Sequence, residues 1–238
     1  MARDRGRRRR VLAACAISGA AVLAVAGIAA AELSTGQAVE REPSVRVVPV
    51  MGLPTPRTDG ETSFEQAVMR RGAVREFAPE ALSLAELGQL LWAAQGGDDD
   101  GRTVPSAGAL YPLEVYVAHE NGVYHYRTEG HEVVATSGDD IRPELAVAAL
   151  DQRAFQTAPA VMMIAGVNQR SAEKYGSRAE RYVLIEVGHA AQNVLLQAGV
   201  LGIGAVPTGA FRDGEVAELF DLPDGTVPLY LIPIGRPA

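Results

Sequence analysis

An apolar run of eight residues, 160–167, stops directly before Asn168. One long amphipathic segment, 178–201, follows further along the chain. The run predicts a strand that is completely buried, because a strand with one exposed face would alternate apolar and polar residues. The segment predicts the longest helix of the chain, since apolar residues recur along one side of it at helical spacing. These residues are Val183, Val187, Ala190, Val194, Leu195 and Ala198. Together the two features predict helices packed on a sheet.

The other signals along the chain mix helices and strands without regular alternation. Two helices are expected to begin with a capping box. In this motif a serine side chain bonds the backbone N–H three residues later, and the side chain of that later residue bonds the serine N–H. The pairs are Ser63 with Gln66, and Ser83 with Glu86. Asn121 and Gly122 predict a hairpin turn. The expected helices are 64–71, 84–94, 141–150 and 213–220, and the expected strands are 113–119, 123–127, 203–206 and 229–234. Such a mixture predicts an α+β domain.

The N-terminus has the layout of an export signal. The first ten residues hold six arginines and one aspartate, a local charge of +5, and residues 11–31 form an apolar run without a charge. This pattern predicts a signal peptide or a signal anchor over residues 1–31. Both stay open, because residues 29–31 offer an Ala-x-Ala cleavage site and the run is long enough to span a bilayer. We expect an exported or membrane-anchored protein with its catalytic domain outside the cytoplasmic membrane, or a cytoplasmic protein if the signal is not functional.

The rest of the chain is acidic and follows a linker. Residues 32–62 contain four prolines and no sustained periodicity, which predicts a linker before a domain at 63–238. Without its first ten residues the chain carries a formal charge of −12, so a nucleic-acid interface is not expected. One cysteine, Cys15, and four scattered histidines show no metal-ligand spacing, so no metal site is predicted.

Arginine supplies 21 of the 22 basic residues, and the only lysine, Lys174, lies beside Tyr175. A guanidinium stays protonated at any working pH, whereas an ammonium can lose its proton in a pocket and act as a base. Lys174 is therefore a candidate for chemistry. The alternative is an ordinary solvated loop residue.

Small residues between two prolines form a second candidate, in the segment 105–112. Ser106, Ala107, Gly108 and Ala109 would let backbone N–H groups approach a planar or anionic ligand closely. A plain turn before a strand would have the same composition.

Several arginines and a third segment complete the candidates. Arginine suits phosphate by its bidentate geometry. The arginines at the end of the first expected helix and after the last expected strand are Arg70, Arg71, Arg75 and Arg236. Thr208 and Gly209 lie in the segment 206–211, at another strand end. The pair Gly202 and Gly204 does not match a dinucleotide fingerprint, because it follows a helix where the fingerprint opens one.

Five motifs occur in a characteristic order. They are Pro-Ser-Ala-Gly-Ala-Leu-Tyr-Pro at 105–112, Lys-Tyr-Gly at 174–176, Gly-His-Ala-Ala-Gln-Asn at 188–193, Val-Pro-Thr-Gly-Ala-Phe at 206–211, and Gly-Arg-Pro at 235–237. Over residues 64–237 the chain resembles the nitroreductase superfamily of flavin enzymes, and within it the SagB/ThcOx-type dehydrogenases that oxidise azoline rings in peptides. The resemblance implies a nitroreductase-like fold with a mainly antiparallel central sheet flanked by helices, preceded here by an N-terminal apolar helix.

The resemblance also implies FMN, bound non-covalently at the interface of a homodimer. Arg71, Arg75 and Arg236 match the family's phosphate and ring-edge contacts. The segments that match those flanking the isoalloxazine ring are Ser106, Ala107, Gly108 and Ala109, and Thr208 with Gly209. Lys174 and Tyr175 match the family's catalytic pair. The family's second arginine and its serine are Gly72 and Ala73 here, so two phosphate contacts are missing.

These observations predict an FMN-dependent oxidoreductase that acts on a small-molecule or peptide-derived substrate, by azoline-to-azole oxidation if the resemblance extends to the reaction. Lys174 would then be the general base and Tyr175 a proton donor or relay. One alternative is an NAD(P)H-dependent nitro or quinone reductase, which needs no base. The other is a non-catalytic flavin-binding protein tethered to the membrane through residues 11–31.

Overall fold

The computed structural model describes residues 49–98 and 101–238, so the expected apolar helix at 11–31 and residues 32–48 of the expected linker lie outside the described residues. The described part contains a seven-stranded sheet in the order β1-β6-β5-β4-β7-β9-β8, and every neighbouring pair in it is antiparallel. Its strands are β1 (Val50–Gly52), β4 (Leu113–His119), β5 (Gly122–Arg127), β6 (Glu132–Ser137), β7 (Ala160–Val167), β8 (Gly204–Ala205) and β9 (Thr226–Gly235). Strands β2 (Gly97–Asp98) and β3 (Gly101–Arg102) form a separate two-stranded sheet.

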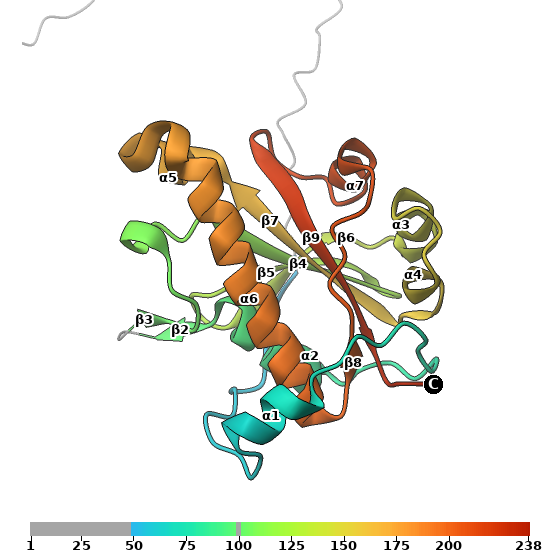
Figure 1. Ribbon diagram of the computed structural model, residues 1–238. Coiled ribbons are helices and arrows are strands. Elements are labelled where there is room, and N and C mark those ends of the chain that lie inside the picture. Colours follow the sequence, from blue (N-terminus) through green and yellow to red (C-terminus); the bar gives the residue numbers. More distant parts are fainter. Residues whose placement is uncertain (1–48, 99–100) are drawn as a thin grey trace, which may run out of the picture. The chain divides into compact units, whose positions relative to one another are not determined.

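Helices cover both faces of the large sheet (Figure 1). They are α1 (Phe64–Arg70), α2 (Leu84–Gln95), α3 (Arg142–Ala148), α4 (Arg153–Thr157), α5 (Asn168–Tyr175), α6 (Ala179–Leu201) and α7 (Asp213–Leu219). Helices α2 and α6 pack on one face, and α3, α4 and α7 pack on the other. Across residues 49–98 and 101–238, no helix combines the length and the apolarity that a membrane crossing requires.

Strand β7 shows why the apolar run lacks polar residues. It lies between β4 and β9, in the interior of the sheet. Met162 and Ile164 pack with α2 and α6, whereas Val161 and Met163 pack with the opposite helix layer. Because both faces are covered, each of these side chains is at most 1% exposed. The predicted buried strand is confirmed, and so is the α+β class.

The predicted helix starts are also confirmed. Ser63 Oγ accepts a bond from the Gln66 N–H at 3.2 Å, and Ser83 Oγ accepts one from the Glu86 N–H at 3.3 Å. Both capping boxes are complete, since the glutamine and glutamate side chains return a bond to the serine backbone. The long helix begins one residue later than expected and ends at Leu201, as expected, and its C-cap Gly202 has a left-handed φ of 70°.

The elements that the sequence did not predict bury few apolar side chains. Strand β6 fully buries only Val133 and Val134, strand β1 has none that is buried, and helix α5 buries only Ser171. Such short elements carry no periodic signal, because they are held by neighbours and not by a hydrophobic stripe of their own.

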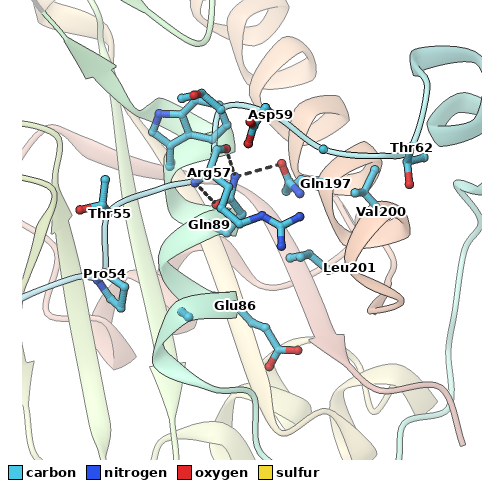
Figure 2. Close-up of a pocket in the computed structure, with 14 residues that line it drawn as sticks. Pro54, Thr55, Arg57, Asp59, Thr62, Glu86, Gln89, Gln197, Val200 and Leu201 are labelled. Atoms are coloured by element: carbon cyan, nitrogen blue, oxygen red, sulfur yellow. Dashed lines mark hydrogen bonds between the residues drawn. The ribbon is translucent and has the colours of Figure 1, made fainter.

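A stretch within the expected linker contacts the body of the protein. Residues 50–52 pair with β6. Further along, the Arg57 N–H donates to Gln89 Oε1 at 2.8 Å, and Gln89 Nε2 donates back to the Arg57 carbonyl at 2.9 Å (Figure 2). Gln89 lies on α2 and is only 8% exposed. This reciprocal pair fixes the stretch against α2 in the way that a strand pair would.

Candidate functional site

The candidate site residues fall into two clusters. The turn cluster comprises Ser106, Ala107, Gly108, Ala109, Lys174 and Tyr175. The arginine cluster comprises Arg71, Arg75, Thr208, Gly209 and Arg236. Helix α6 separates the lysine from the first arginine, because the Tyr175 ring packs on Tyr182 near the start of α6 while the Arg71 backbone lies beside Gly199 near its end. At 1.5 Å per residue, the helix rises about 26 Å between Tyr182 and Gly199.

The turn cluster is built on a strained loop before β4. The Tyr111 N–H donates to Ser106 Oγ at 2.9 Å, and the Ala109 N–H donates to the Ser106 carbonyl at 3.1 Å. Gly108, Ala109 and Tyr111 all have positive φ, at 64°, 55° and 45°. Residues other than glycine rarely adopt this region, so the loop presents its backbone outward at a cost in conformational energy.

Gly108 leaves the space that Lys174 and Tyr175 occupy. A Cβ atom placed on Gly108 would lie 2.7 Å from Tyr175 Oη and 2.8 Å from Lys174 Nζ. Both distances are below normal contact, so any larger residue at position 108 would displace the ends of both side chains. The structure thus brings together two motifs far apart in the sequence, and it places an amine and a phenol at the backbone of one turn.

Lys174 and Tyr175 end helix α5, which stops at Gly176 with a positive φ of 53°. Lys174 is exposed, and its Nζ lies 5.6 Å from the centre of the Tyr175 ring. Tyr175 is half-buried and meets the Tyr182 ring edge-on, with ring centres 4.9 Å apart. Tyr182 lies on α6 and steadies the phenol of Tyr175, although no sequence motif singled it out.

An ion-pair network supports the turn from behind. Arg170 Nη1 donates to the Tyr111 carbonyl at 3.1 Å, and the same guanidinium pairs with Glu114. Glu114 also bonds His125 at 2.6 Å. Burial alone would raise the pKa of Glu114, but the hydrogen bonds and charges of His125 and Arg170 outweigh it and hold that pKa below its ordinary value. Glu114 therefore stays ionised and orients Arg170 toward the turn.

The segment after α1 brings the arginines of the second cluster to one end of the sheet. The Val74 N–H donates to the Ala205 carbonyl at 3.1 Å, and the Ala78 N–H donates to the Arg236 carbonyl at 2.9 Å. Arg71 and Arg75 are exposed. Among the described residues, neither forms an ion pair. Their guanidinium groups can therefore take an anion without first losing a carboxylate.

Arg236 is held by the cap of helix α2. Its Nη2 donates to Glu86 Oε1 at 2.6 Å, while Glu86 Oε2 accepts from the Ser83 backbone and hydroxyl. Burial alone would raise the pKa of Glu86, but the bonds from Ser83 and Arg236 lower it overall. Glu86 also lines a cavity of about 440 Å³ that contains Arg57 and Gln197 (Figure 2). No member of either cluster lines this cavity, so it is separate from the candidate site.

Thr208 pairs with β9 at Leu231, five residues before Arg236, which directly follows the end of that strand. The Thr208 N–H donates to the Leu231 carbonyl at 2.8 Å, and the Leu231 N–H donates back at 3.0 Å. At about 3.3 Å per residue, β9 carries the chain about 17 Å from Leu231 to Arg236. The arginine cluster therefore offers cations at one end. At the other end Thr208 is buried with its backbone bonded to Leu231, and Gly209 is exposed.

Position 72 has room for the side chain that the family places there. A Cβ atom on Gly72 would meet only the Arg70 carbonyl oxygen, at 4.0 Å. The absence of an arginine at this position is therefore not imposed by packing within the chain. In the described part of the chain, no three His, Cys, Asp or Glu side chains are grouped as metal ligands would be.

Comparison with known proteins identifies the family of the chain. The profile of the nitroreductase family matches residues 68–236. A Methanocaldococcus jannaschii protein assigned to the nitroreductases, MJ1384, is 44% identical over 184 residues, which are 74% of this chain and 92% of that protein. The Escherichia coli microcin B17-processing protein McbC is 29% identical over 166 residues, covering 63% of this chain and 61% of McbC.

A solved structure supports the same assignment. The crystal structure of a protein from Ralstonia eutropha assigned to the nitroreductases superimposes with a TM-score of 0.71 at 29% sequence identity, covering 79% of this chain and 90% of that one. The family profile spans most of the chain, and the sheet and helix layers agree with this structure. The chain belongs to the nitroreductase family.

Proposed function

We propose that the protein is an FMN-dependent dehydrogenase of the SagB/ThcOx type, which oxidises an azoline-like ring in a peptide-derived or small-molecule substrate. The observation that carries this proposal is the meeting of Lys174, Tyr175 and Gly108, which places a titratable amine at a backbone turn. The similarity to McbC, a protein named for processing microcin B17, supports a peptide-derived substrate. Proteins of the nitroreductase family generally use flavin cofactors.

FMN would bind along the arginine cluster. Arg71, Arg75 and Arg236 would hold its phosphate, and Thr208 and Gly209 would lie against the ring. When bound, FMN supplies a ring that accepts or returns a hydride. The turn cluster of the same chain lies far along α6 from Arg71. A second copy of the chain would therefore supply Ser106 to Ala109, together with Lys174 and Tyr175, which suits a homodimer.

Lys174 would move the proton of the reaction. Oxidation of an azoline to an azole removes one hydride and one proton from the ring. Lys174 Nζ would take the proton from the ring carbon, and FMN, when bound, would supply the acceptor for the hydride. The Tyr175 phenol, held by Tyr182, donates a hydrogen bond to the substrate or relays the proton outward.

Replacing Lys174 by arginine tests this role. Lys174→Arg keeps the positive charge but cannot act as a base, so dehydrogenation should fall by at least about 100-fold while FMN remains bound. Arg178→Lys is a matched control, because it exchanges the same two residue types at an exposed position nearby. Unchanged dehydrogenation in Lys174→Arg would contradict the proposed base.

A second candidate is an NAD(P)H-dependent nitro or quinone reductase. The similarity to the Methanocaldococcus jannaschii protein assigned to the nitroreductases favours it. A reductase of this kind needs no base, so Lys174→Arg would reduce a nitroaromatic or a quinone at the normal rate. Running both assays on this one variant separates the two candidates.

We also propose that the catalytic domain is exported or anchored outside the cytoplasmic membrane. The proposal rests on the arginine-rich start and on the apolar run at 11–31. Fractionation of cells that make the full chain tests it. Recovery of the whole protein in the cytosol, at its full length, would contradict export.

A further inference from the structure

Helix α6 places a carboxyl group in the interior, directly behind the turn cluster. Glu186 is only 2% exposed, and its neighbours on the same face, Val183, Val187 and Ala190, belong to the apolar core. Burying a carboxyl group costs free energy unless it is paired or uncharged. A glutamate at this position therefore calls for a physical role.

The loop that carries the turn cluster lies against one face of α6. Asn193 Nδ2 donates to the carbonyl of Thr103 at 3.0 Å. Thr103 lies in this loop, eight positions after the end of α2. Glu186 lies two helical turns earlier on the same face and sits beside Ser106, the first residue of the turn cluster. Asn193 thus fixes the start of the loop, and Glu186 lies under the part that would face the flavin.

The surroundings of Glu186 leave hydrogen-bonding groups without partners. Among the buried side-chain atoms of the described residues, only Glu186 Oε1 and Gln95 Nε2 have none. Gln95 is 1% exposed, and its Oε1 accepts from Arg102 Nη1 at 3.2 Å. Ser106 Oγ already accepts the Tyr111 N–H, so its own hydroxyl hydrogen is free to donate. The site is therefore polar but incompletely satisfied.

Burial raises the pKa of Glu186. The Ser106 hydroxyl, the Gln95 amide and the positive charges of Arg102 and His189 oppose this effect but do not outweigh it. Arg102 reaches the site from β3 and His189 lies one turn along α6.

We propose that Glu186 is a positioning residue for flavin binding: a buried carboxyl that holds Ser106, and through it the Gly108 turn, at the place where Lys174 and Tyr175 meet it. Loss of its proton would leave a buried anion. Because the cost of burying it outweighs the bonds that Ser106 and Gln95 offer, the turn would open to let water reach the carboxylate. This inference rests on the proposed flavin site. It adds a residue that touches neither flavin nor substrate but makes flavin affinity depend on pH.

Glu186→Gln tests the proposal, because the amide keeps the shape of the side chain and cannot ionise. The dissociation constant of FMN is measured by flavin fluorescence on the full-length protein, without turnover, from about pH 4, near the ordinary pKa of a glutamate, to about pH 9. Affinity should be similar for the two proteins at the acidic end. Wild-type affinity should then fall relative to the variant, by up to about tenfold per pH unit through which Glu186 ionises. A ratio that stays constant with pH would overturn the proposal.

Two controls isolate the carboxyl. The ionisation of the FMN phosphate affects both proteins equally and cancels in the ratio. Glu180→Gln changes an exposed glutamate of the same helix and should follow the wild-type curve. In a His189→Gln background, the proteins with and without Glu186→Gln should still diverge with pH. Divergence that disappears there would assign the effect to His189 and overturn the proposal.

A measurement without flavin separates this inference from the proposed function. The pKa of Glu186 is raised in the folded protein. The contribution of protonated Glu186 to stability is therefore complete at a pH below the ordinary pKa of a glutamate, and it is lost as the pH rises through the raised pKa. Glu186→Gln should therefore gain stability over wild type with increasing pH in chemical unfolding of the flavin-free protein. If Glu186→Gln does not fold, Ser106→Ala serves instead. The loss of stability with rising pH should then occur at a higher pH than in wild type, because the Ser106 hydroxyl, which lowers the pKa of Glu186, is gone. If the stabilities of Glu186→Gln and wild type do not diverge with pH, this inference is overturned while the proposed function stands. If the wild type fails to bind FMN, both are overturned.

Discussion

Lys174 and Gly108 are matched: a Cβ atom on Gly108 would lie 2.8 Å from the Nζ atom of Lys174. The two residues come from different motifs, one before β4 and one at the end of α5. The glycine also has a φ of 64°, which a larger residue adopts only with strain. The only lysine of the chain is thus placed against a backbone turn that has no side chain to block it.

Gly108→Ala should displace Lys174 and Tyr175. The added methyl group meets both side chains and also disfavours the left-handed backbone, so we expect a loss of about 1 kcal/mol or more in unfolding free energy. We also expect a clear fall in turnover. Urea unfolding and a dehydrogenation assay measure the two effects.

Gly214→Ala is the control for this substitution. Gly214 lies in α7, where a Cβ atom meets nothing within 4 Å. Alanine in a helix should stabilise by up to about 1 kcal/mol and leave turnover unchanged. Equal behaviour of the two alanine variants would contradict the role given to Gly108.

Restoring the missing phosphate contacts should strengthen flavin binding. Gly72→Arg combined with Ala73→Ser adds an arginine and a hydroxyl at positions where the added Cβ on Gly72 has room. FMN affinity should rise by about tenfold, equivalent to about 1.4 kcal/mol, while riboflavin affinity stays the same because riboflavin has no phosphate. Equal gains for both flavins would show that the added groups do not contact phosphate.

Arg236→Gln should have the opposite effect. Removing one charged contact should weaken FMN by about tenfold and leave riboflavin nearly unchanged. The capping box of α2 does not depend on Arg236, so the fold should persist. Arg127→Gln, which removes an arginine from a surface ion pair with Glu132, should bind both flavins normally. Equal weakening of FMN and riboflavin by Arg236→Gln would place the phosphate elsewhere.

Glu114→Gln should destabilise the protein at neutral pH and not in acid. The folded protein holds the pKa of the Glu114 carboxyl below its ordinary value. Ionised Glu114 therefore stabilises the fold at any pH above the ordinary pKa, and this stabilisation is lost as the pH falls through the lower pKa of the folded protein. We expect a loss of about 1–3 kcal/mol near neutral pH, because Arg170 and His125 lose an anionic partner. Unfolding curves at neutral and acidic pH measure it, with the exposed Glu129→Gln as control. A loss that persists at acidic pH would contradict the ionised pair.

The fold was predictable where the signal was local or dense. Buried β7, amphipathic α6 and the two serine caps each carry a pattern within a few residues. Strand β1 and helix α5 carry none, because β1 is held by pairing to β6 and α5 by its contacts with α6. Their formation depends on tertiary neighbours that the local sequence does not reveal.

For the candidate site, the residue types were predictable but their supports were not. The motifs identified Lys174, Gly108 and the arginines. Glu186 and Arg170 lie in helices whose sequences show no motif for them, and their roles arise from which loop packs against each helix. The separation of the two clusters along α6 is likewise a property of the assembled fold.

The most direct test of the central claim is the absorbance spectrum of residues 32–238 purified without added flavin, with the released cofactor identified. An FMN-dependent enzyme should show flavin bands at close to one FMN per chain. Colourless protein that also fails to bind added FMN would contradict that claim, because neither the arginine cluster nor the turn cluster would then serve a flavin.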